Sequence, residues 1–179
     1  MPRPGLFAAV ALSGLAFTAC ATMNVSSHVE RGVNFAQYHT YEWGPADALP
    51  TGDPRLDNNP FFNDYLQGAV EKQMAAKGFV RPTSGTPDLL IHYHANISKS
   101  FEVNGVDTQN GNCYDNCQPR VSEYEQGTLV LDVVDAHTSK VVWRGWAQDS
   151  VEGVIDNQDR MERQINKGVT EMFKRFPIS

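Results

Sequence analysis

Two histidines, two residues apart, are the sharpest chemical feature of this 179-residue chain. His92 and His94 lie in residues 88–98, where apolar and polar side chains alternate, a pattern that predicts a β-strand. Side chains at this spacing point to one face of a strand, with Cα atoms about 7 Å apart. The pair could start a zinc site if a third ligand converged on it, and His137 is a distant candidate. We favour a position on the open face of a half-covered sheet, and we expect no metal or other cofactor.

Two aspartates resemble the acid pair of a hydrolase. Asp132 and Asp135 are an odd number of residues apart, so in one strand they would face opposite sides. Asp135 is better placed to start a turn, in which its carboxylate accepts hydrogen bonds from nearby backbone N–H groups. The sequence also lacks a nucleophile elbow, a phosphate-binding loop, a dinucleotide-binding glycine motif and an H-E-x-x-H zinc motif. We therefore expect a protein that is not an enzyme.

A third candidate is a binding surface on a later strand. Alternation there places Trp143 with Val141 toward the core, and Arg144 and Trp146 with Val142 on the other side. Exposed Trp and Arg side chains are enriched at protein-binding hot spots, which makes Arg144 and Trp146 a candidate partner surface. The alternative is that the arginine stacks over the tryptophan and only keeps this surface soluble.

The beginning of the chain has the pattern of an export signal. Arg3 is the only charged residue before Glu30, and the apolar run after it is shorter than the roughly 20 residues that span a bilayer. Phe17-Thr18-Ala19-Cys20 resembles the lipobox of bacterial lipoproteins, in which the cysteine is acylated and becomes the first residue. We predict residues 1–19 as a lipoprotein signal peptide, residues 20–24 as a lipidated tether and residues 25–179 as one domain.

The lipobox reading sets the expected location. Diacylglycerol and palmitate groups on Cys20 would hold the protein on a membrane, since two or more acyl chains anchor stably. Ala21 stands where an Asp would retain similar lipoproteins at the inner membrane, so we expect the periplasmic face of the outer membrane. The alternative is ordinary cleavage after Ala21, because Ala19-Cys20-Ala21 also fits an A-x-A site. That would release a soluble periplasmic protein beginning at Thr22.

The remaining cysteines form an even pair. Once Cys20 is lipidated, Cys113 and Cys117 are left, and in an oxidising compartment they are expected to form a local disulfide. Their C-x-x-x-C spacing is not the C-x-x-C of a redox or zinc site. Two free thiols are the alternative.

The elements that must position these residues follow from hydrophobic periodicity. The mature chain of about 160 residues suits one domain. Residues 44–60 are rich in Pro and Gly, which predicts a loop. Residues 99–125 are polar and contain glycine, which predicts a long excursion from the sheet, such as an extended hairpin tip. Strands are predicted over residues 25–30, 35–43, 88–98, 127–135 and 140–148, and amphipathic helices over residues 60–78 and 157–176. The order β-β-α-β-β-β-α predicts a two-layer α+β fold, with both helices on one face of a mainly antiparallel sheet.

A resemblance to a known family rests on several short motifs in a fixed order. They are Tyr38-His39-Thr40-Tyr41-Glu42-Trp43, Lys77-Gly78-Phe79, Pro87-Asp88-Leu89-Leu90, Gly127-Thr128-Leu129, Asp132-Val133-Val134-Asp135-Ala136 and Val142-Trp143-Arg144-Gly145, with Phe173 to Pro177 at the end. The set resembles a family of bacterial lipoproteins defined by a domain of unknown function, number four-one-three-six in that series. The resemblance covers residues 25–177 and implies no catalytic residues.

The charge of the chain further limits the classes of function that are expected. With 15 basic and 21 acidic residues the chain carries a formal charge of −6, and without a Lys/Arg cluster it is not expected to bind nucleic acid. The favoured function is a non-enzymatic, membrane-anchored lipoprotein that binds an envelope protein or supports an assembly. A small-ligand or lipid carrier, anchored or soluble, is the alternative and would need an apolar cavity between helices and sheet. A metal-assisted enzyme would need both histidines and a third ligand in one cleft.

Overall fold

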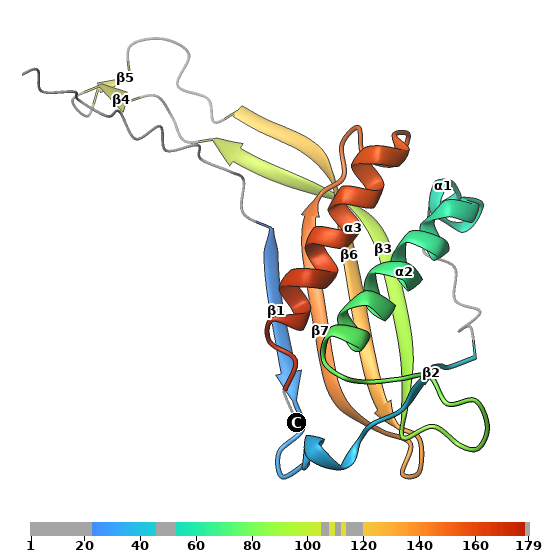
Figure 1. Cartoon of the computed structure of the whole chain (residues 1–179). Helices are drawn as coiled ribbons and strands as arrows, with labels where there is room; N and C mark the ends of the chain where they lie inside the picture. Colours follow the sequence, from blue (N-terminus) through green and yellow to red (C-terminus); the bar gives the residue numbers. More distant parts are fainter. Residues whose placement is uncertain (1–22, 46–52, 105–107, 110–111, 114–119, 178–179) are drawn as a thin grey trace, which may run out of the picture.

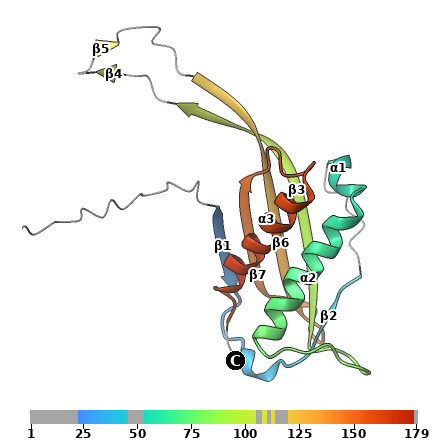
Figure 2. The ribbon, with the colours of Figure 1, turned by 45° about the horizontal axis from the view of Figure 1, so that its top comes forward.

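The protein folds as one five-stranded sheet with helices packed on one of its faces. The computed structural model describes residues 23–45, 53–104, 108–109, 112–113 and 120–177. Helices α2 (Pro60–Ala76) and α3 (Gln158–Phe173) lie side by side against the sheet in both views (Figures 1 and 2). The predicted α+β class and the placement of both helices on one face therefore agree with the structure. We call the opposite, uncovered side of the sheet the open face.

The sheet is mixed, which corrects the predicted topology. Its order is β1-β7-β6-β3-β2, with β1 (Asn24–Val29), β2 (Tyr41–Trp43), β3 (Leu89–Asn104), β6 (Arg120–Asp135) and β7 (Lys140–Ser150). Strand β2 runs parallel to β3, and the other neighbours are antiparallel. A parallel pair needs a long crossover connection, and the segment between β2 and β3 that contains α2 provides it. Strands β4 (Thr108–Gln109) and β5 (Asn112–Cys113) form a separate two-stranded pair.

Two predicted boundaries were wrong near the first strands. Only Tyr41–Trp43 of the predicted strand 35–43 is a strand, because Phe35–Gln37 forms a 3₁₀ turn capped by the Asn34 side chain. The predicted loop 44–60 contains the short helix α1 (Pro54–Asp57), whose N-cap Asp53 accepts a hydrogen bond from the Arg55 backbone N–H. An Asp cap followed by Pro starts a helical turn that hydrophobic periodicity cannot reveal in four residues.

Asparagine side chains cap the N-termini of both long helices. The Asn59 side chain accepts a hydrogen bond from the Phe61 N–H at the start of α2, and Asn157 accepts one from the Arg160 N–H at the start of α3. Gly78 adopts φ +87° just after α2, which is the left-handed conformation that ends helices and favours glycine. Local sequence signals therefore determine both helices.

Aromatic side chains fill one end of the space between sheet and helices. Trp143 of β7 is 1% exposed, and its ring lies 5.6 Å from that of Phe173 and 5.1 Å from that of Phe176. Phe35 and Phe79 also contact Phe176, with ring centroids 5.6 and 5.9 Å away. This cluster lies at the end of the sheet where β2 and the C-terminus are located (Figure 1).

A β-bulge in the sheet overturns part of the predicted alternation. The pairing shifts between Val133↔Trp143 and Val134↔Val141, so that Val142 has no partner on β6. As a result Val142 and Trp143 are both buried while Val141 is 39% exposed. The prediction that Val141 joins the core and Val142 the open face was therefore wrong, because an extra residue in one strand reverses the alternation on either side of it.

Strands β3 and β6 are longer than predicted and project beyond the helices. Their pairing runs without a break from Leu89↔Asp135 to Asn104↔Arg120. We call residues 99–104 and 120–125 the arm; it extends away from the body in both ribbon views (Figure 2). The predicted excursion 99–125 thus begins and ends as a regular antiparallel ladder.

Candidate functional site

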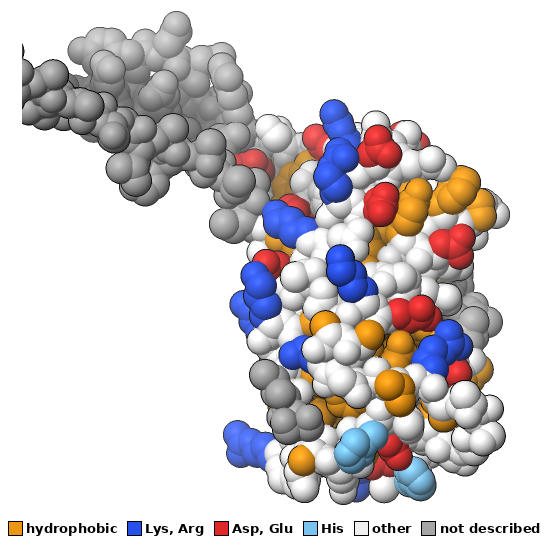
Figure 3. All heavy atoms as spheres, viewed as in Figure 1, with side chains coloured by type: hydrophobic (Ala, Val, Ile, Leu, Met, Phe, Trp, Pro, Cys, Tyr) orange, Lys and Arg blue, Asp and Glu red, His pale blue; other side chains and the backbone are white. Residues whose placement is uncertain are grey.

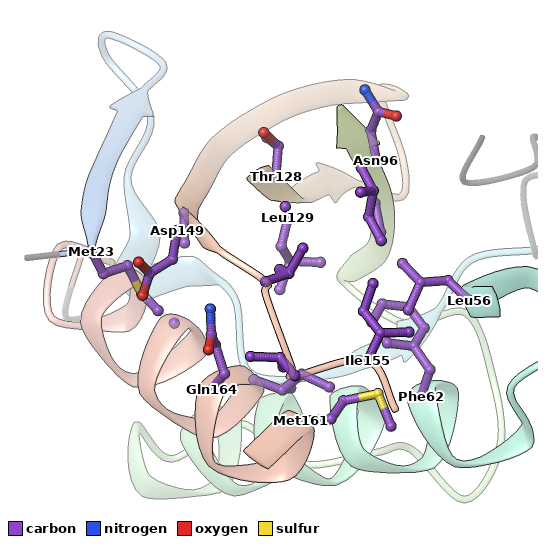
Figure 4. Close-up of a pocket in the computed structure, with 18 residues that line it drawn as sticks. Met23, Leu56, Phe62, Asn96, Thr128, Leu129, Asp149, Ile155, Met161 and Gln164 are labelled. Carbon is purple, nitrogen blue, oxygen red and sulfur yellow. The ribbon is translucent and has the colours of Figure 1, made fainter. Parts of the chain in front are cut away.

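An apolar cavity lies between the sheet and the helices, at the end of the sheet away from the aromatic cluster (Figure 4). It has a volume of about 90 Å³. Its sheet side is formed by Ala95, Leu129 and Ala147, and its helix side by Met161 and Ile165. Most of the lining is hydrocarbon, so the cavity favours an apolar occupant over water.

Small residues are the reason that the cavity exists. Ala95, Gly127 and Ala147 occupy sheet positions that face the helices, where a Leu or Ile would fill the space. Gly168 of α3 faces Ala147 of β7, and a Cβ added to it would lie 3.5 Å from the Ala147 Cβ, in ordinary van der Waals contact. The helices therefore close over a sheet surface that lacks the side chains to fill the volume beneath them.

Two polar side chains at the rim form hydrogen bonds within the protein. Gln164 donates a hydrogen bond from Nε2 to the Ser150 carbonyl oxygen at 2.7 Å. Thr128 accepts one at its Oγ1 from Gln148 Nε2 at 3.1 Å. The site is therefore suited to an apolar ligand, which would be held by the shape of the cavity and by hydrophobic contact.

Met23 closes the end of the cavity nearest the N-terminus. Figure 4 places its side chain at one side of the cavity, with Leu56 and Phe62 at the other. The Met23 Sδ would lie 3.5 Å from a Cβ added to Gly168, so the side chain rests against the small-residue position of α3. The first described residue of the chain therefore forms part of the cavity wall.

The open face carries a row of polar residues that spans four strands. The strand register aligns His28 of β1, Arg144 of β7, Asp132 of β6 and His92 of β3. Arg144 donates from Nε and Nη2 to the two Asp132 carboxylate oxygens, at 2.5 and 2.6 Å, and Asp132 is only 5% exposed. These hydrogen bonds raise the pKa of the Arg144 guanidinium, as expected for a charge-assisted pair.

The predicted partner surface is changed by this ion pair. Trp146 aligns with Val130 and His94 in the next row of the open face, so Arg144 and Trp146 do share that face as the alternation predicted. The Arg144 head group, however, is committed to Asp132. Arg144 therefore compensates the charge of the buried Asp132 carboxylate, although its own side chain is half exposed.

The two histidines of the sequence prediction lie on the open face as expected. His92 aligns with Asp132 and His94 with Val130, and a Cβ added to Gly44 would overlap the His92 ring, which places the chain after β2 against it. Among the residues that the structure describes, no three His, Cys, Asp or Glu side chains are arranged to hold a metal ion. His137 lies in the β6–β7 turn, where Nδ1 is 3.9 Å from Asp135 Oδ1.

Asp132 and Asp135 serve separate structural purposes. Asp135 Oδ1 accepts hydrogen bonds from the backbone N–H groups of His137 and Thr138, at 2.8 and 2.9 Å, and Oδ2 accepts one from the Tyr38 hydroxyl at 2.8 Å. Burial raises the pKa of Asp135, but these hydrogen bonds outweigh it, so that its pKa is lowered overall. The predicted role in a turn is confirmed, and the two carboxylates do not form an acid pair.

Several predicted sites cannot be placed. Cys20 and Cys117 lie outside the described residues, and of Cys113 the structure describes only the strand pairing in β5. Lipidation at Cys20 and the Cys113–Cys117 disulfide therefore stay predictions. Within the described residues, no helix is long and apolar enough to cross a membrane.

Sequence reasoning missed the surface of the arm. Phe101 and Val121 are 62% and 60% exposed, and Lys99 forms an ion pair of 2.6 Å with Glu123 beside them. The sequence does contain a signal for it. Phe101 is apolar and lies at an odd-numbered position, as the apolar residues of 89–97 do, so it continues the alternation of β3 beyond residue 98. On the side where α3 lies, by contrast, basic and acidic side chains are interspersed (Figure 3).

Comparison with known proteins gives a family and a fold. The family model described as "Domain of unknown function (DUF4136)" matches residues 25–178. A search of curated proteins finds no match. A PDZ domain protein from Parabacteroides distasonis ATCC 8503 has a similar structure, at a TM-score of 0.51 and 15% sequence identity. The match covers 88% of this chain but 36% of that one, so the chain spans about a third of its length.

Two further structures are less similar. The PelC dodecamer from Paraburkholderia phytofirmans matches at a TM-score of 0.45 and 10% identity, covering 84% of this chain and 97% of that one. A putative neuraminyllactose-binding hemagglutinin homolog from Helicobacter pylori matches at 0.40 and 11% identity, covering 78% and 83%.

Proposed function

The chain belongs to the family defined by the domain of unknown function DUF4136, and from that premise we propose that it is an exported, lipid-anchored binding module of the cell envelope. In this proposal Cys20 carries the lipid, the domain lies at the periplasmic face of the outer membrane, and the arm binds another envelope protein. The protein has no catalytic role. The signal segment and the lipobox-like motif support the anchor.

The exposed apolar pair on the arm carries the proposal. Phe101 lies opposite Glu123 in the ladder, and Val121 is two residues from Glu123, so Phe101 and Val121 share one face of the arm. They are 62% and 60% exposed, the highest values among the large apolar side chains that the structure describes. Such a patch marks a site of interaction when it stands out from a polar surface.

Charged groups border the patch in the way that interface rims do. Lys99 pairs with Glu123 beside it, and Glu125 pairs with Arg55 of α1 at 2.6 Å. An apolar centre with a charged, solvent-accessible rim is the usual anatomy of a protein-binding surface.

The described chain begins at the end of the sheet that carries the arm. Strand β1 begins at Asn24, which pairs with Gln148, and Gln148 pairs with Thr128 just below the arm. A lipid on Cys20, four residues before Asn24, would therefore hold the arm near the membrane surface. A membrane-associated protein is the partner that this placement favours.

Site-specific photo-crosslinking in intact membranes tests the proposal. A photo-reactive phenylalanine analogue at position 101 of the full chain should give a discrete adduct with one envelope protein. Position 61 is the matched control, because Phe61 is also an exposed phenylalanine, 45% exposed, but lies on α2. Equal adducts from both positions, or none from position 101, would contradict the proposal.

The cavity favours a second function, binding of a small apolar ligand. Its lining is almost entirely hydrocarbon and it lies between helices and sheet, as a carrier would require. Native mass spectrometry of the purified full chain should then show a co-purified apolar molecule. A ligand-free mass in preparations from the membrane would argue against this second function.

A further inference from the structure

Strand β1 forms one edge of the sheet, and its outer side faces no other strand. The sheet order places β1 at one edge and β2 at the other, and Figure 1 shows β1 in blue at the margin of the body. Glu30 donates its backbone N–H to the Val142 carbonyl oxygen at 2.9 Å. Because hydrogen bonding alternates along an antiparallel pair, the backbone groups of Val25, Ser27 and Val29 point away from β7. Within the part of the chain that the structure describes, no strand pairs with them.

The edge of β1 lacks the features that usually block the addition of a further strand. Free edges are normally kept short or carry charged residues or proline. Strand β1 has six residues, Asn24–Val29, and none of them is Asp, Glu, Lys, Arg or Pro. The opposite edge strand, β2, has only three residues. The arm, whose strands also have free edges, carries Lys99, Glu102, Arg120, Glu123 and Glu125.

An antiparallel pairing of two β1 strands is self-complementary when Ser27 lies on the two-fold axis. In that register Ser27 faces Ser27 of the second copy, and Val25 faces Val29. The outward backbone groups of these three residues then all find partners, because each facing pair exchanges two hydrogen bonds. Ser26 lies opposite His28, so no like charges face each other across the pair.

The exposed side chain of Val29 adds a hydrophobic contribution to this pairing. Val29 is 38% exposed, whereas Val25 is half-buried against the core. They align with Trp143 and Ala147 of β7, which are buried beneath the helices, so both valines lie on the covered side of the sheet. The pairing covers Val29 with Val25 of the second copy. It also brings the two α3 helices toward each other, because α3 contacts β1 in each copy.

We propose that β1 is a self-association edge, through which two copies of the chain pair antiparallel about a two-fold axis at Ser27. The two five-stranded sheets then form one continuous sheet with the helices of both copies on the same side. A strand of a different protein is the competing occupant. A second copy is favoured because a two-fold contact requires one surface to complement itself, as β1 does in this register. The inference depends neither on lipidation of Cys20 nor on binding at the arm.

Cysteine cross-linking in intact cells tests the register. Each variant is made in the full chain with Cys113→Ser and Cys117→Ser, so that Cys20 is the only other cysteine, and the cells are treated with a mild oxidant. Facing residues of a hydrogen-bonded pair have Cα atoms about 5.5 Å apart, which suits a disulfide. Ser27→Cys should therefore give a disulfide-linked dimer of the chain, which a reductant separates.

The neighbouring serine provides the matched control. Ser26 faces His28 in the proposed register, so two Ser26 residues are diagonal neighbours about 7–8 Å apart, which is too far for a disulfide without backbone movement. Ser26→Cys should therefore give much less dimer than Ser27→Cys. Combining Ser26→Cys with His28→Cys places two thiols opposite each other and should restore the cross-link. The parent chain without an introduced cysteine measures the background from Cys20.

Sedimentation equilibrium of the purified full chain measures association without any cross-link. Val29→Lys places a charge in the pairing and should shift the protein from dimer to monomer. Val141→Lys is the control, because Val141 is 39% exposed, as Val29 is 38% exposed, but lies on β7 and not on the edge strand. Circular dichroism checks the fold of both variants. If Val29→Lys fails to fold, the cysteine variants still decide, because they introduce only small side chains.

The register and the mass together decide the inference. A cross-linked dimer from Ser27→Cys but not from Ser26→Cys, with a dimer that Val29→Lys disrupts and Val141→Lys does not, is the expected result. Equal cross-linking at positions 26 and 27, no cross-link at position 27, or a monomeric wild-type chain would overturn it. An adduct between Ser27→Cys and a different protein would overturn it too, because the edge would then take a foreign strand.

Discussion

The Arg144 guanidinium lies across the β7–β6 ladder from the Asp132 carboxylate and donates two hydrogen bonds to it, at 2.5 and 2.6 Å. Asp132 is 5% exposed, whereas the Arg144 side chain is half exposed. A carboxylate buried in a sheet is stable only when a cation and hydrogen bonds compensate its lost hydration. The pair is therefore a structural unit of the open face.

A substitution of Arg144 should leave the Asp132 carboxylate buried without its cation and should therefore destabilise the fold. We expect Arg144→Met to lower the free energy of unfolding by about 2 kcal/mol, because the carboxylate loses its charged donor. Asp132→Leu combined with Arg144→Met should recover most of that loss. Urea denaturation of the two single variants and the double variant measures the coupling. Lys99→Met is the control: it breaks an exposed ion pair and should leave the free energy of unfolding nearly unchanged. Additive effects at positions 132 and 144 would contradict the prediction.

Gly145 should tolerate no side chain. A Cβ at this position would overlap the buried Trp143 ring, so Gly145→Ala is expected to cost about 1–3 kcal/mol through overpacking. Gly68→Ala is the matched control, because nothing lies within 4 Å of a Cβ at this helical position. It should instead stabilise the protein by about 1 kcal/mol, since alanine is the better helix former. Thermal unfolding that shifts in the same direction for both variants would count against this account.

Ionisation of Asp88 should make the free energy of unfolding depend on pH in the acid range. Backbone N–H groups of His39 and Thr40 donate to its carboxylate, at 2.8 and 2.9 Å. The hydrogen bond from His39 is the largest cause of the lowered pKa of Asp88, which burial opposes. A lowered folded-state pKa contributes stability that is present above the unfolded pKa of about 3.9 and is lost as pH falls through the folded value.

The variant Asp88→Asn tests this pH dependence. We expect it to lower the free energy of unfolding by about 1 kcal/mol at pH 7 and by less at pH 3, as measured by urea denaturation across that range. Asp64→Asn, at an exposed position on α2, should show no comparable change between the two pH values. A difference between wild type and Asp88→Asn that stays constant down to pH 3 would disprove the linkage.

Residues of the arm should contribute to binding without contributing to stability. Phe101→Ser is expected to change the free energy of unfolding by less than about 0.5 kcal/mol, because the side chain is 62% exposed. Phe62→Ala, at a core position that is 7% exposed, should cost about 3–5 kcal/mol. Calorimetry of the two variants gives the comparison. A large loss from Phe101→Ser would make the arm a structural element and would weaken its role as a partner surface.

The sequence by itself determined the features that depend on neighbouring residues. Asn59 and Asn157 cap α2 and α3, and the alternation along β3 places His92 and His94 opposite the core residues. Asp135 starts its turn through hydrogen bonds to the backbone two and three residues later. Each of these signals acts within a few residues, so periodicity and capping rules can detect it. The family, too, was identified from short motifs in order.

Only the tertiary structure decided what depends on residues far apart in the chain. The parallel pairing of β2 with β3 joins residues 48 apart (Tyr41↔Leu89), and the arm joins residues 16 to 26 apart (Asn104↔Arg120 to Lys99↔Glu125). The bulge at Val142 is a shift in the register between β6 and β7. The cavity arises because Ala95, Ala147 and Gly168, which are widely separated in sequence, meet beneath α3. Packing is a property of surfaces brought together, and the small residues that create this cavity look unremarkable in their own segments.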